Sequence, residues 1–471
     1  MHIQINHTDW KQAIGVVTSA INKKGHWDSA TWMKIEATGD DIYMSSTNLE
    51  TSVRIHVPGL VIEEGAVWVV STLISKANGT KKYPCVDITA NDGKVIVLAN
   101  GLQMELPVQD AEKAVGIKFE SNADTIIIED TAAFTRAINA GVMHAAKEDN
   151  RPILQGIELS FKDDLFTAIA ADGFRLSKCT WGAICENIPT FRVIIPATAL
   201  KLMSKVGFSR NSRVLLQIEE CYVHFTFGNT QFIVQRIEGT YPDVSQIIPG
   251  SSLYRGYGLI EECLPVVAKI ANMIKRPYWE ADNGACLHPE GSAWVWTSNK
   301  ADLVFESHWP VYYKQEFDYR PNMGFNIRYV HDALTAMQDA GKFCMETSDA
   351  SSPMKLSASI GRLLMTIVVM PMAALRRNNQ DNTSVSDPLP EGMKDLLNWQ
   401  TVSSWRTQLK TWQDTITCDL VEREIDLNEL VEGTNIFGYD LPNNLYPEHG
   451  KLFFTRAQAI KLTWIDKAVS A

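Results

Sequence analysis

Three stretches of the chain repeat one pattern at a period of about 130 residues, and this repeat limits the possible folds more than any other feature. Each copy contains a predicted β-hairpin with a glycine in its turn, and Gly101, Gly228 and Gly361 lie 127 and 133 residues apart. A second set of glycines follows a predicted short helix, and Gly79, Gly207 and Gly341 lie 128 and 134 residues apart. Because both markers drift together, the chain is predicted to contain three copies of one domain.

Each copy opens with a short apolar strand that leads into an amphipathic helix, and the three strands are expected at residues 3–5, 126–128 and 259–260. Trp10 and Phe134 begin equivalent apolar stripes, since each is followed by Ala-Ile at the third and fourth positions. Thr8 or Asp9 is the expected N-cap of the first helix, and Pro265 is expected near the start of the third. This pattern predicts an α+β fold with two helices and antiparallel sheets in each copy.

The composition is that of a folded globular protein. The 471 residues are 45% hydrophobic and 21% charged, and this length suits three or four domains. No apolar run reaches the roughly 18 residues of a membrane-spanning helix. The first residues lack the basic head and apolar core of a signal peptide, so we expect a cytoplasmic chain that does not enter membranes. The formal net charge of -11, taken alone, argues against a dedicated DNA-binding protein, which usually has an excess of basic residues.

The cysteines and histidines form no recognisable catalytic or metal-binding motif. The 8 cysteines include no Cys-x-x-Cys pair, and the 10 histidines include no His-Glu-x-x-His motif. The sequence also lacks the Gly-x-Ser-x-Gly, P-loop and Gly-x-Gly-x-x-Gly motifs. We therefore expect no catalytic residue, no metal and no cofactor. An enzyme built on repeated α+β domains is the alternative that these observations disfavour.

Short motifs recur at characteristic separations in the second and third copies. They are RPILQG at 151–156, ADGFRL at 171–176, GTYPD at 239–243, GFNIRYV at 324–330 and VVMPM at 368–372. In this order the motifs resemble the bacterial DNA polymerase III beta-subunit family, the beta sliding clamps. The resemblance extends from residue 1 to about residue 373. It implies three clamp domains, at residues 1–122, 123–248 and 249–374.

The resemblance implies a ring that works without catalysis. In this family two three-domain chains meet head to tail, so that six domains enclose duplex DNA, with sheets outside and helices lining the hole. The implied function is that of a DNA sliding clamp, a processivity factor in DNA replication that tethers the replicative polymerase. The implied partners are double-stranded DNA bound without sequence preference, a second copy of the chain, and the DNA polymerase, clamp loader and repair proteins, which bind through short peptides. Three copies disfavour a trimeric clamp with two domains per chain. A clamp-like interaction scaffold that does not encircle DNA stays the alternative.

The resemblance also assigns residues to three sites. The peptide-binding groove is expected between the second and third domains, at Leu154, Ala171, Gly173, Phe174, Arg175, Leu176, Pro242, Ile247, Val368, Val369, Met370, Pro371 and Met372. The DNA-facing residues are expected to be Lys23, Lys24, Lys76, Lys147, Lys201, Lys205, Lys269 and Lys275. The dimer contact is expected between the hairpin strand with Met104 and Leu106 and the third domain near Ile270 and Met273. Because Phe174 stands where the family usually has His, the groove is expected to differ in specificity.

Residues 375–471 form a C-terminal extension of 97 residues that the resemblance does not cover. A polar linker to about residue 391 precedes an amphipathic helix with Trp405, Leu409 and Trp412 on one face. A last helix is expected after Thr455. Since the extension begins beside the predicted groove, one hypothesis is that it covers the groove or recruits a partner.

The acidic residues are expected on the outer wall of the ring, with the lysines gathered on the inward helices.

Overall fold

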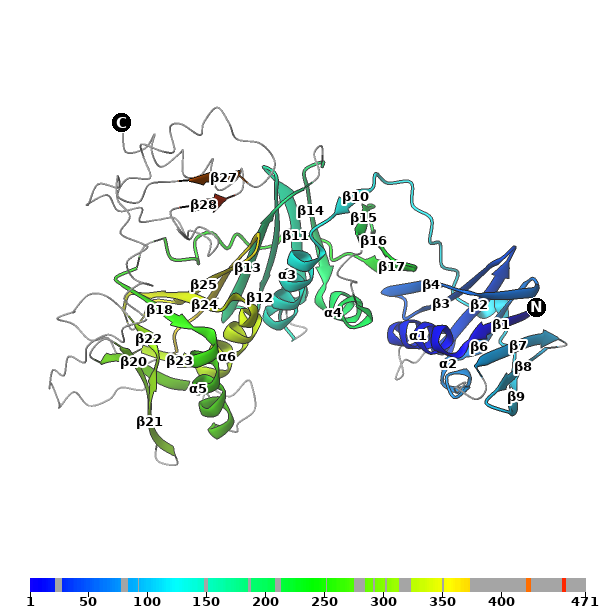
Figure 1. The fold of residues 1–471 in the computed structure, drawn as a ribbon, viewed down its shortest axis with the longest axis horizontal. Helices are drawn as coiled ribbons and strands as arrows, with labels where there is room; N and C mark the ends of the chain where they lie inside the picture. The colour runs from blue at the N-terminus through cyan, green and yellow to red at the C-terminus, as the bar shows by residue number, and fades with distance from the viewer. Residues whose placement is uncertain are drawn as a thin grey trace. The chain divides into compact units, whose positions relative to one another are not determined.

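The structure of the chain is a computed structural model that describes residues 1–21, 28–77, 84–91, 93–147, 151–184, 188–207, 213–250, 252–274, 284–290, 293–300, 303–312, 323–349, 351–372, 421–424 and 451–454. The element order repeats three times, and Figure 1 labels these elements along the chain from blue to yellow. Each copy has a strand and a helix, then four or five strands, a second helix and three further strands. This repeat confirms the predicted α+β architecture with two helices per copy among the described residues.

The first copy comprises β1 (His2–Asn6), α1 (His7–Val17), β2 (Trp32–Thr38), β3 (Asp41–Thr47), β4 (Thr51–Val57), β5 (Gly59–Glu63), β6 (Gly65–Val70), α2 (Ser71–Ile74), β7 (Cys85–Asn91), β8 (Lys94–Ala99) and β9 (Leu102–Pro107). The second comprises β10 (Ile126–Ile128), α3 (Thr131–His144), β11 (Gly156–Lys162), β12 (Leu165–Ala171), β13 (Arg175–Gly182), β14 (Phe191–Pro196), α4 (Ala197–Val206), β15 (Val214–Ile218), β16 (Tyr222–Phe227) and β17 (Thr230–Gln235).

The third copy comprises β18 (Tyr254–Leu259), α5 (Ile260–Met273), β19 (Gly284–Glu290), β20 (Ala293–Lys300), β21 (Leu303–Trp309), β22 (Val311–Tyr312), β23 (Met323–Asn326), α6 (Ile327–Ala336), β24 (Lys342–Thr347), β25 (Met354–Ile360) and β26 (Leu363–Val369). Within the extension, β27 (Val421–Glu424) and β28 (Lys451–Phe454) pair antiparallel. The helices predicted for the extension lie outside the described residues.

The turn and capping residues explain where several elements begin and end. Asn100 and Gly101 join β8 to β9 with φ values of 54° and 74°, which are the left-handed values that a two-residue hairpin turn needs. Helix α1 begins earlier than predicted, because the Asn6 side chain, not Thr8 or Asp9, caps it by accepting the Thr8 N–H at 2.9 Å. Pro265 lies inside α5 and not near its start, so the helix continues past a residue that has no N–H to donate.

Two compact units divide the chain, and each contains parts of two copies. The first unit is Met1–Thr135, Asn187–Pro189 and Val193–Gly239, and the second is Arg136–Glu186, Thr190–Arg192 and Thr240–Ala471. The predicted domain boundaries at 122, 248 and 374 stay a prediction, because these units follow a different division.

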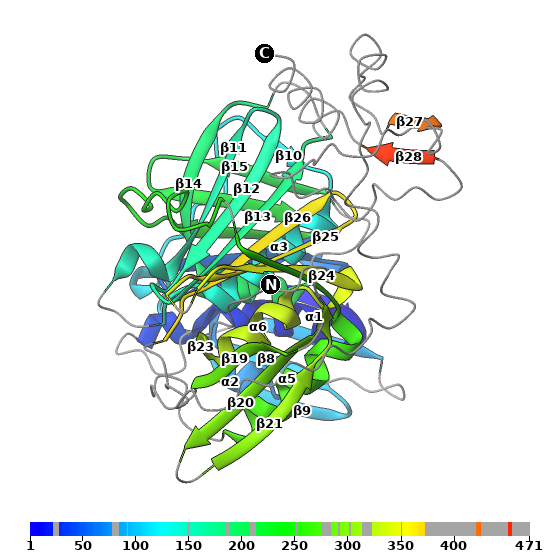
Figure 2. The same ribbon diagram turned by 90° about the vertical axis from the view of Figure 1, so that its left-hand side faces the viewer.

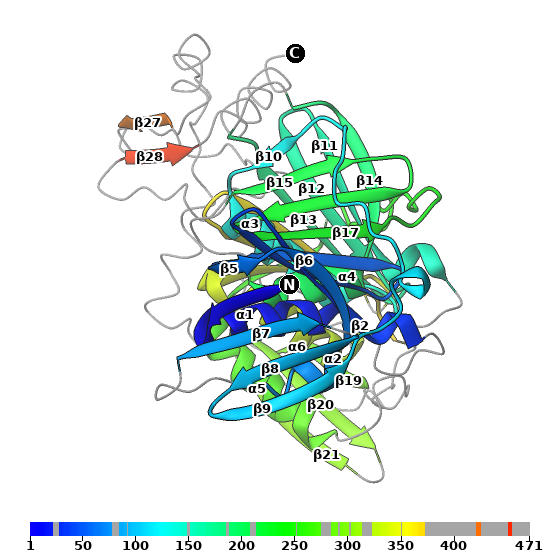
Figure 3. The ribbon, with the colours of Figure 1, turned by 90° about the vertical axis from the view of Figure 1, so that its right-hand side faces the viewer.

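The first unit is built on an eight-stranded sheet with the order β10-β15-β16-β17-β4-β3-β2-β6. The first and second copies meet in it through the antiparallel pair β17 and β4, where Phe232 lies opposite Val53. A five-stranded sheet has the order β5-β1-β7-β8-β9, and Figure 3 shows β7, β8 and β9 side by side. Helix α1 packs on β3 and β4, and its Trp10 and Ala13 are buried. The core of this unit therefore lies between α1 and the sheets.

The second unit contains β11, β12, β13, β26, β25, β24, β18 and β22 of the nine-stranded sheet β14-β11-β12-β13-β26-β25-β24-β18-β22, most of which faces the viewer in Figure 2. The second and third copies meet in it through the antiparallel pair β13 and β26. A four-stranded sheet has the order β21-β20-β19-β23. Helices α5 and α6 pack against each other, and Val267, Ile270, Val330 and Leu334 are buried in their core faces. Among the described residues, no helix has the length and apolar character needed to cross a membrane.

Candidate functional site

The strand pair β13 and β26 brings two predicted groove segments together, although they are far apart in the sequence. Arg175 lies opposite Val369 and Leu176 opposite Val368 in the antiparallel register. The ladder continues one step further, because the Met370 N–H donates to the Phe174 carbonyl at 2.8 Å. Val368 and Val369 are fully buried, so they belong to the core beneath this junction.

Tyr241 ties a third predicted segment to the same junction. Its hydroxyl oxygen accepts the Ala171 N–H at 2.8 Å, and Ala171 lies opposite Leu176 in the β12–β13 pair. Burial raises the pKa of the Tyr241 phenol, so the group stays neutral at physiological pH. Pro242 and Ile247 follow on the same segment and are exposed.

Apolar side chains remain exposed around this junction. Phe174 is 62% exposed and Ile247 is 41% exposed, whereas Met370, Pro371 and Met372 are half-buried. Leu154 is nearly buried. The predicted groove residues therefore divide into a buried set and an exposed set, and whether they bind a ligand stays a prediction.

Arg175 differs from the prediction, because its side chain is buried and cannot line an open groove. The residue is 2% exposed. Its guanidinium donates to the Asp172 carboxylate at 2.9 Å, to the Asp332 carboxylate at 2.6 Å and to the Met143 carbonyl at 2.8 Å. Its charged end also lies 4.5 Å from the ring centre of Tyr329. Arg175 thus joins β13 to α3 and α6.

The Arg175 contacts also fix the turn that exposes Phe174. One oxygen of Asp172 accepts the N–H groups of Phe174 and Arg175 at 2.9 and 3.0 Å, while the other accepts from the guanidinium. Gly173 has a φ of 90°, which glycine adopts without strain. A Cβ at this position would lie 2.7 Å from an Arg151 nitrogen, so glycine also allows Arg151 to approach. We infer that Arg175 positions the turn instead of touching a ligand.

His144 is a second buried titratable group next to Arg175. Its ring is fully buried, and Nδ1 lies 2.7 Å from the Ala140 carbonyl. Burial, and then the nearby positive charge of Arg175, lowers the pKa of His144 to about 4. The imidazole is therefore neutral at physiological pH, and it adds no second positive charge beside the guanidinium.

The sequence motifs reveal only part of this arrangement. Asp172 and Tyr241 lie inside the recognised motifs, but the motifs do not show what their side chains contact. Asp332, Met143 and His144 lie outside the motifs. The helical spacing of Tyr329 and Asp332, three residues apart on α6, was the available signal, because it places both side chains on one helix face.

The predicted DNA-facing lysines are only partly described. Lys201 and Lys205 are exposed on α4, whose Leu200 and Met203 are buried on the other face. Lys76, Lys147 and Lys269 are also exposed, near the ends of α2 and α3 and on α5. Lys23, Lys24 and Lys275 lie outside the described residues. The role of these lysines stays a prediction.

The residues predicted for dimer contact lie on an open sheet edge and on α5. Strand β9 is the last strand of the five-stranded sheet, with Met104 half-buried and Leu106 nearly buried. On α5, Met273 is 50% exposed, whereas Ile270 is buried in the core of its own copy. Strand β21 is likewise the last strand of the four-stranded sheet. Of the two α5 residues, only Met273 offers a surface.

Comparison with known proteins explains the repeat. Residues 127–243 match the sequence profile of the DNA polymerase III beta subunit, central domain. The beta sliding clamp of Streptococcus pneumoniae is 26% identical over 259 residues, covering 53% of this chain and 68% of that protein. The beta sliding clamp of Pseudomonas putida is 21% identical over 382 residues, covering 79% of this chain and 100% of that protein.

Residues 127–243 therefore form a domain of the DNA polymerase III beta-subunit type, and the chain as a whole resembles the beta sliding clamps. The fold of the family agrees with this assignment. The sliding clamp of Bacillus subtilis superposes with a TM-score of 0.72 at 17% identity, covering 79% of this chain and 99% of that one. The beta subunit of Pseudomonas aeruginosa superposes with a TM-score of 0.71 at 19% identity, covering 79% and 100%. Another structure of the Pseudomonas aeruginosa clamp is bound to griselimycin, with a TM-score of 0.71 at 18% identity and coverage of 79% and 100%.

Proposed function

We propose that this protein is a DNA sliding clamp that encircles duplex DNA as a dimer and holds the replicative polymerase on its template. One observation carries the proposal, which is the number of strands in the sheets that end at β9 in the first copy and at β21 in the third copy. The two sheets in which copies meet have eight and nine strands, whereas a five-stranded sheet ends at β9 and a four-stranded sheet ends at β21. Joining β9 to β21 of a second chain would form a nine-stranded sheet, close in size to the eight- and nine-stranded sheets at the two internal junctions.

Such a head-to-tail junction would close a ring of two chains if β9 of each chain paired with β21 of the other. Main-chain hydrogen bonds between β9 and β21 would pair the two edges, which have no neighbouring strand among the described residues. Met104, Leu106 and Met273 are proposed to provide the apolar contacts that accompany this pairing. A closed ring of six copies explains how an acidic protein with a net charge of -11 could hold DNA, since the holding is topological.

The lysines are proposed to contact phosphates weakly and without sequence preference. An exposed charge pair near a protein surface contributes about 1 kcal/mol or less, so a few such contacts would guide DNA without stopping it. Lys201 and Lys205 are the best candidates, because both are exposed on one helix. A clamp of this kind would act as a tether and would need no catalytic group or cofactor.

Retention on circular DNA tests this proposal directly. After loading onto nicked circular DNA, we expect the protein to stay bound through washing and to leave once the circle is cut at one site. A topological link explains this result, because a ring can slide off only at an end. The measurement is the fraction of labelled protein that stays on the DNA before and after cutting. Equal loss from circular and linear DNA would instead support an interaction scaffold that does not encircle DNA.

The exposed apolar residues at the β13–β26 junction are proposed to bind short peptides from polymerase, clamp loader and repair proteins. Half-buried methionines suit an adaptable apolar site, and burying one Leu or Phe anchor contributes roughly 1.5–3 kcal/mol. Phe174 would add an aromatic surface to this site, because it projects from the turn that Arg175 positions. The occupants are therefore expected to carry apolar and aromatic anchors.

Substitution of Ile247 by alanine is expected to weaken peptide binding by roughly tenfold, because it removes apolar contact area from the site. The matched control is Ile184→Ala, since Ile184 is 46% exposed against 41% for Ile247 and lies beyond the far end of β13. Fluorescence anisotropy would measure both affinities. The probe is a labelled peptide that carries a leucine and an aromatic residue as its apolar anchors. If the two variants lost the same amount of peptide affinity, the junction would not be the binding site. The DNA-retention experiment would still test the separate proposal that the protein encircles DNA.

A further inference from the structure

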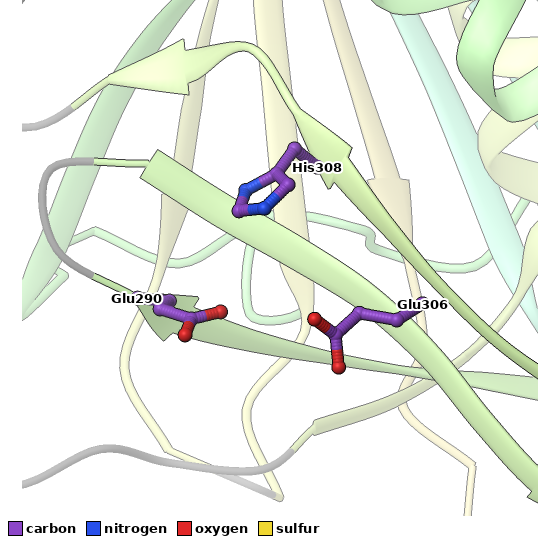
Figure 4. A group of neighbouring side chains, drawn as sticks. All are labelled: Glu290, Glu306 and His308. Carbon is purple, nitrogen blue, oxygen red and sulfur yellow. The ribbon is translucent and has the colours of Figure 1, made fainter. Parts of the chain in front are cut away.

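Three metal-ligating side chains converge on the four-stranded sheet, away from the β13–β26 junction. Glu290 ends β19, and Glu306 and His308 lie on β21. One ligand atom of each side chain lies within 4.8 Å of the other two. Figure 4 shows the two carboxylates pointing toward each other, with the imidazole ring beside them. We propose that Glu290, Glu306 and His308 bind a divalent transition-metal ion.

The strand register explains why these residues meet. Glu290 pairs with Ala293 of β20, while Thr297 and Val295 of β20 pair with Glu306 and His308. Alternate residues of a strand share a face, so all three donors lie on one face of the sheet. β19 and β21 are separated by β20 and so by roughly 9–10 Å. Glu290 and Glu306 are also offset along the strands, because their β20 partners Ala293 and Thr297 are four residues apart. The long glutamate side chains bring the ligand atoms within 4.8 Å of one another.

The opposite face of the same strands holds the donors on a rigid support. Trp294, Trp296 and Trp309 are fully buried there, and the rings of Trp296 and Trp309 lie 5.3 Å apart. Packed aromatic side chains fix the backbone of β20 and β21, so they hold the Cα positions of Glu306 and His308 in place. Metal sites on rigid strands need less ordering than sites on loops.

The distances suit a metal ion after small movements of the side chains. Three atoms within 4.8 Å of one another surround a point at most about 2.8 Å from each of them. Zinc and similar ions bind nitrogen and carboxylate oxygen at about 2.0–2.2 Å, so each donor must move by less than about 1 Å. The imidazole favours a transition metal over Ca²⁺, which takes 6–8 oxygen ligands. A cation would also offset the repulsion between the two carboxylates.

The sequence gives no hint of this site, because its donors come from strands that are not neighbours. Glu306 and His308 alone form a common pair on an exposed strand, and Glu290 lies 16 residues earlier. The expectation of no metal rested on ligand pairs that are close in sequence. The bound ion would tie β19 to β21 across β20 and would stiffen the edge of the sheet.

Titration of the full chain with Mn²⁺, followed by electron paramagnetic resonance, tests the proposal. Mn²⁺ is the probe because thiolates prefer softer metals, so the cysteines compete little. We expect His308→Ala and Glu306→Gln each to weaken the binding by at least about tenfold, since each removes a ligand. The matched control is His56→Ala, because among the described residues His56 Nε2 contacts one carboxylate, that of Asp41 at 2.9 Å. This control is expected to bind Mn²⁺ like the unchanged chain.

Thermal unfolding provides the second measurement. Mn²⁺ is expected to raise the unfolding midpoint of the unchanged chain and of His56→Ala, and to leave that of His308→Ala unmoved. Circular dichroism without metal would verify that each variant keeps its fold. The proposal fails if His308→Ala and Glu306→Gln bind Mn²⁺ like the unchanged chain, or if His56→Ala loses as much affinity as they do. Displacement of Mn²⁺ by equimolar Ca²⁺ would also overturn the assignment to transition metals.

Discussion

Replacing Arg175 by leucine is expected to destabilise the second compact unit by about 3–5 kcal/mol. The substitution leaves the Asp172 and Asp332 carboxylates without the guanidinium that both contact, at 2.9 and 2.6 Å. It also removes the donor to the Met143 carbonyl and the contact with the Tyr329 ring. Breaking a buried ion pair is costly because the remaining carboxylates stay largely desolvated without the cation that offset their charge. Hydrogen–deuterium exchange of β13 and α6 would measure the loss as faster exchange at their protected amides.

Arg136→Leu is the matched control for this experiment. Arg136 also contacts an aspartate near α6, Asp339, at 3.2 Å, but both side chains are far more exposed than Arg175. Exposed ion pairs contribute about 0–1 kcal/mol, so this variant is expected to exchange almost like the unchanged chain. Arg175→Leu should also weaken peptide binding, because the Phe174 turn loses its support. If the two arginine variants exchanged equally, the buried network would not support the junction.

The free energy of unfolding is expected to fall by about 3 kcal/mol between pH 6.5 and pH 4 because of His144 alone. The pKa of His144 is lowered from 6.5 to about 4 in the folded chain, so between these values the unfolded chain binds one proton more than the folded chain. Protonation therefore favours unfolding as the pH falls through this range. The stabilisation is fully present above pH 6.5, and its loss is complete only below about pH 4.

Comparison with His144→Gln isolates this contribution. Glutamine does not titrate, so the difference in unfolding free energy between the two proteins should change by about 1.4 kcal/mol per pH unit between pH 6.5 and 4. Denaturant titrations at several pH values would give this slope, whatever the absolute stability of the variant. A difference that stayed constant over the whole range would contradict the buried, neutral state of His144.

The sequence predicts the local parts of the fold and misses the long-range pairing. The hairpin at Asn100–Gly101 and the two helices of each copy follow from turn residues and apolar spacing, which act within a few positions. The sheets shared between copies do not, since β17 with β4 and β13 with β26 join strands far apart in the chain. The hydrophobic periodicity of a strand does not show which strand edge of another copy it pairs with.

The same limit applies to the candidate site. The motifs located Phe174, Arg175 and the 368–372 segment at one site, and the structure brings these residues together. The burial of Arg175 could not be predicted, because its partner Asp332 lies 157 residues further along the chain. A motif records which residue is present, but the environment of its side chain depends on elements that fold around it.

The sharing of sheets between copies changes what counts as a module in this chain. A fragment cut at the copy boundaries would leave β4, β13, β17 or β26 without its neighbour, and such bare edges promote aggregation. The two compact units instead keep each of these pairs intact. Natural recombination and laboratory chimeras would thus exchange whole junctions more readily than whole repeats. The repeated sequence marks the copies, whereas the shared sheets mark the compact units in which strands of two copies pack together.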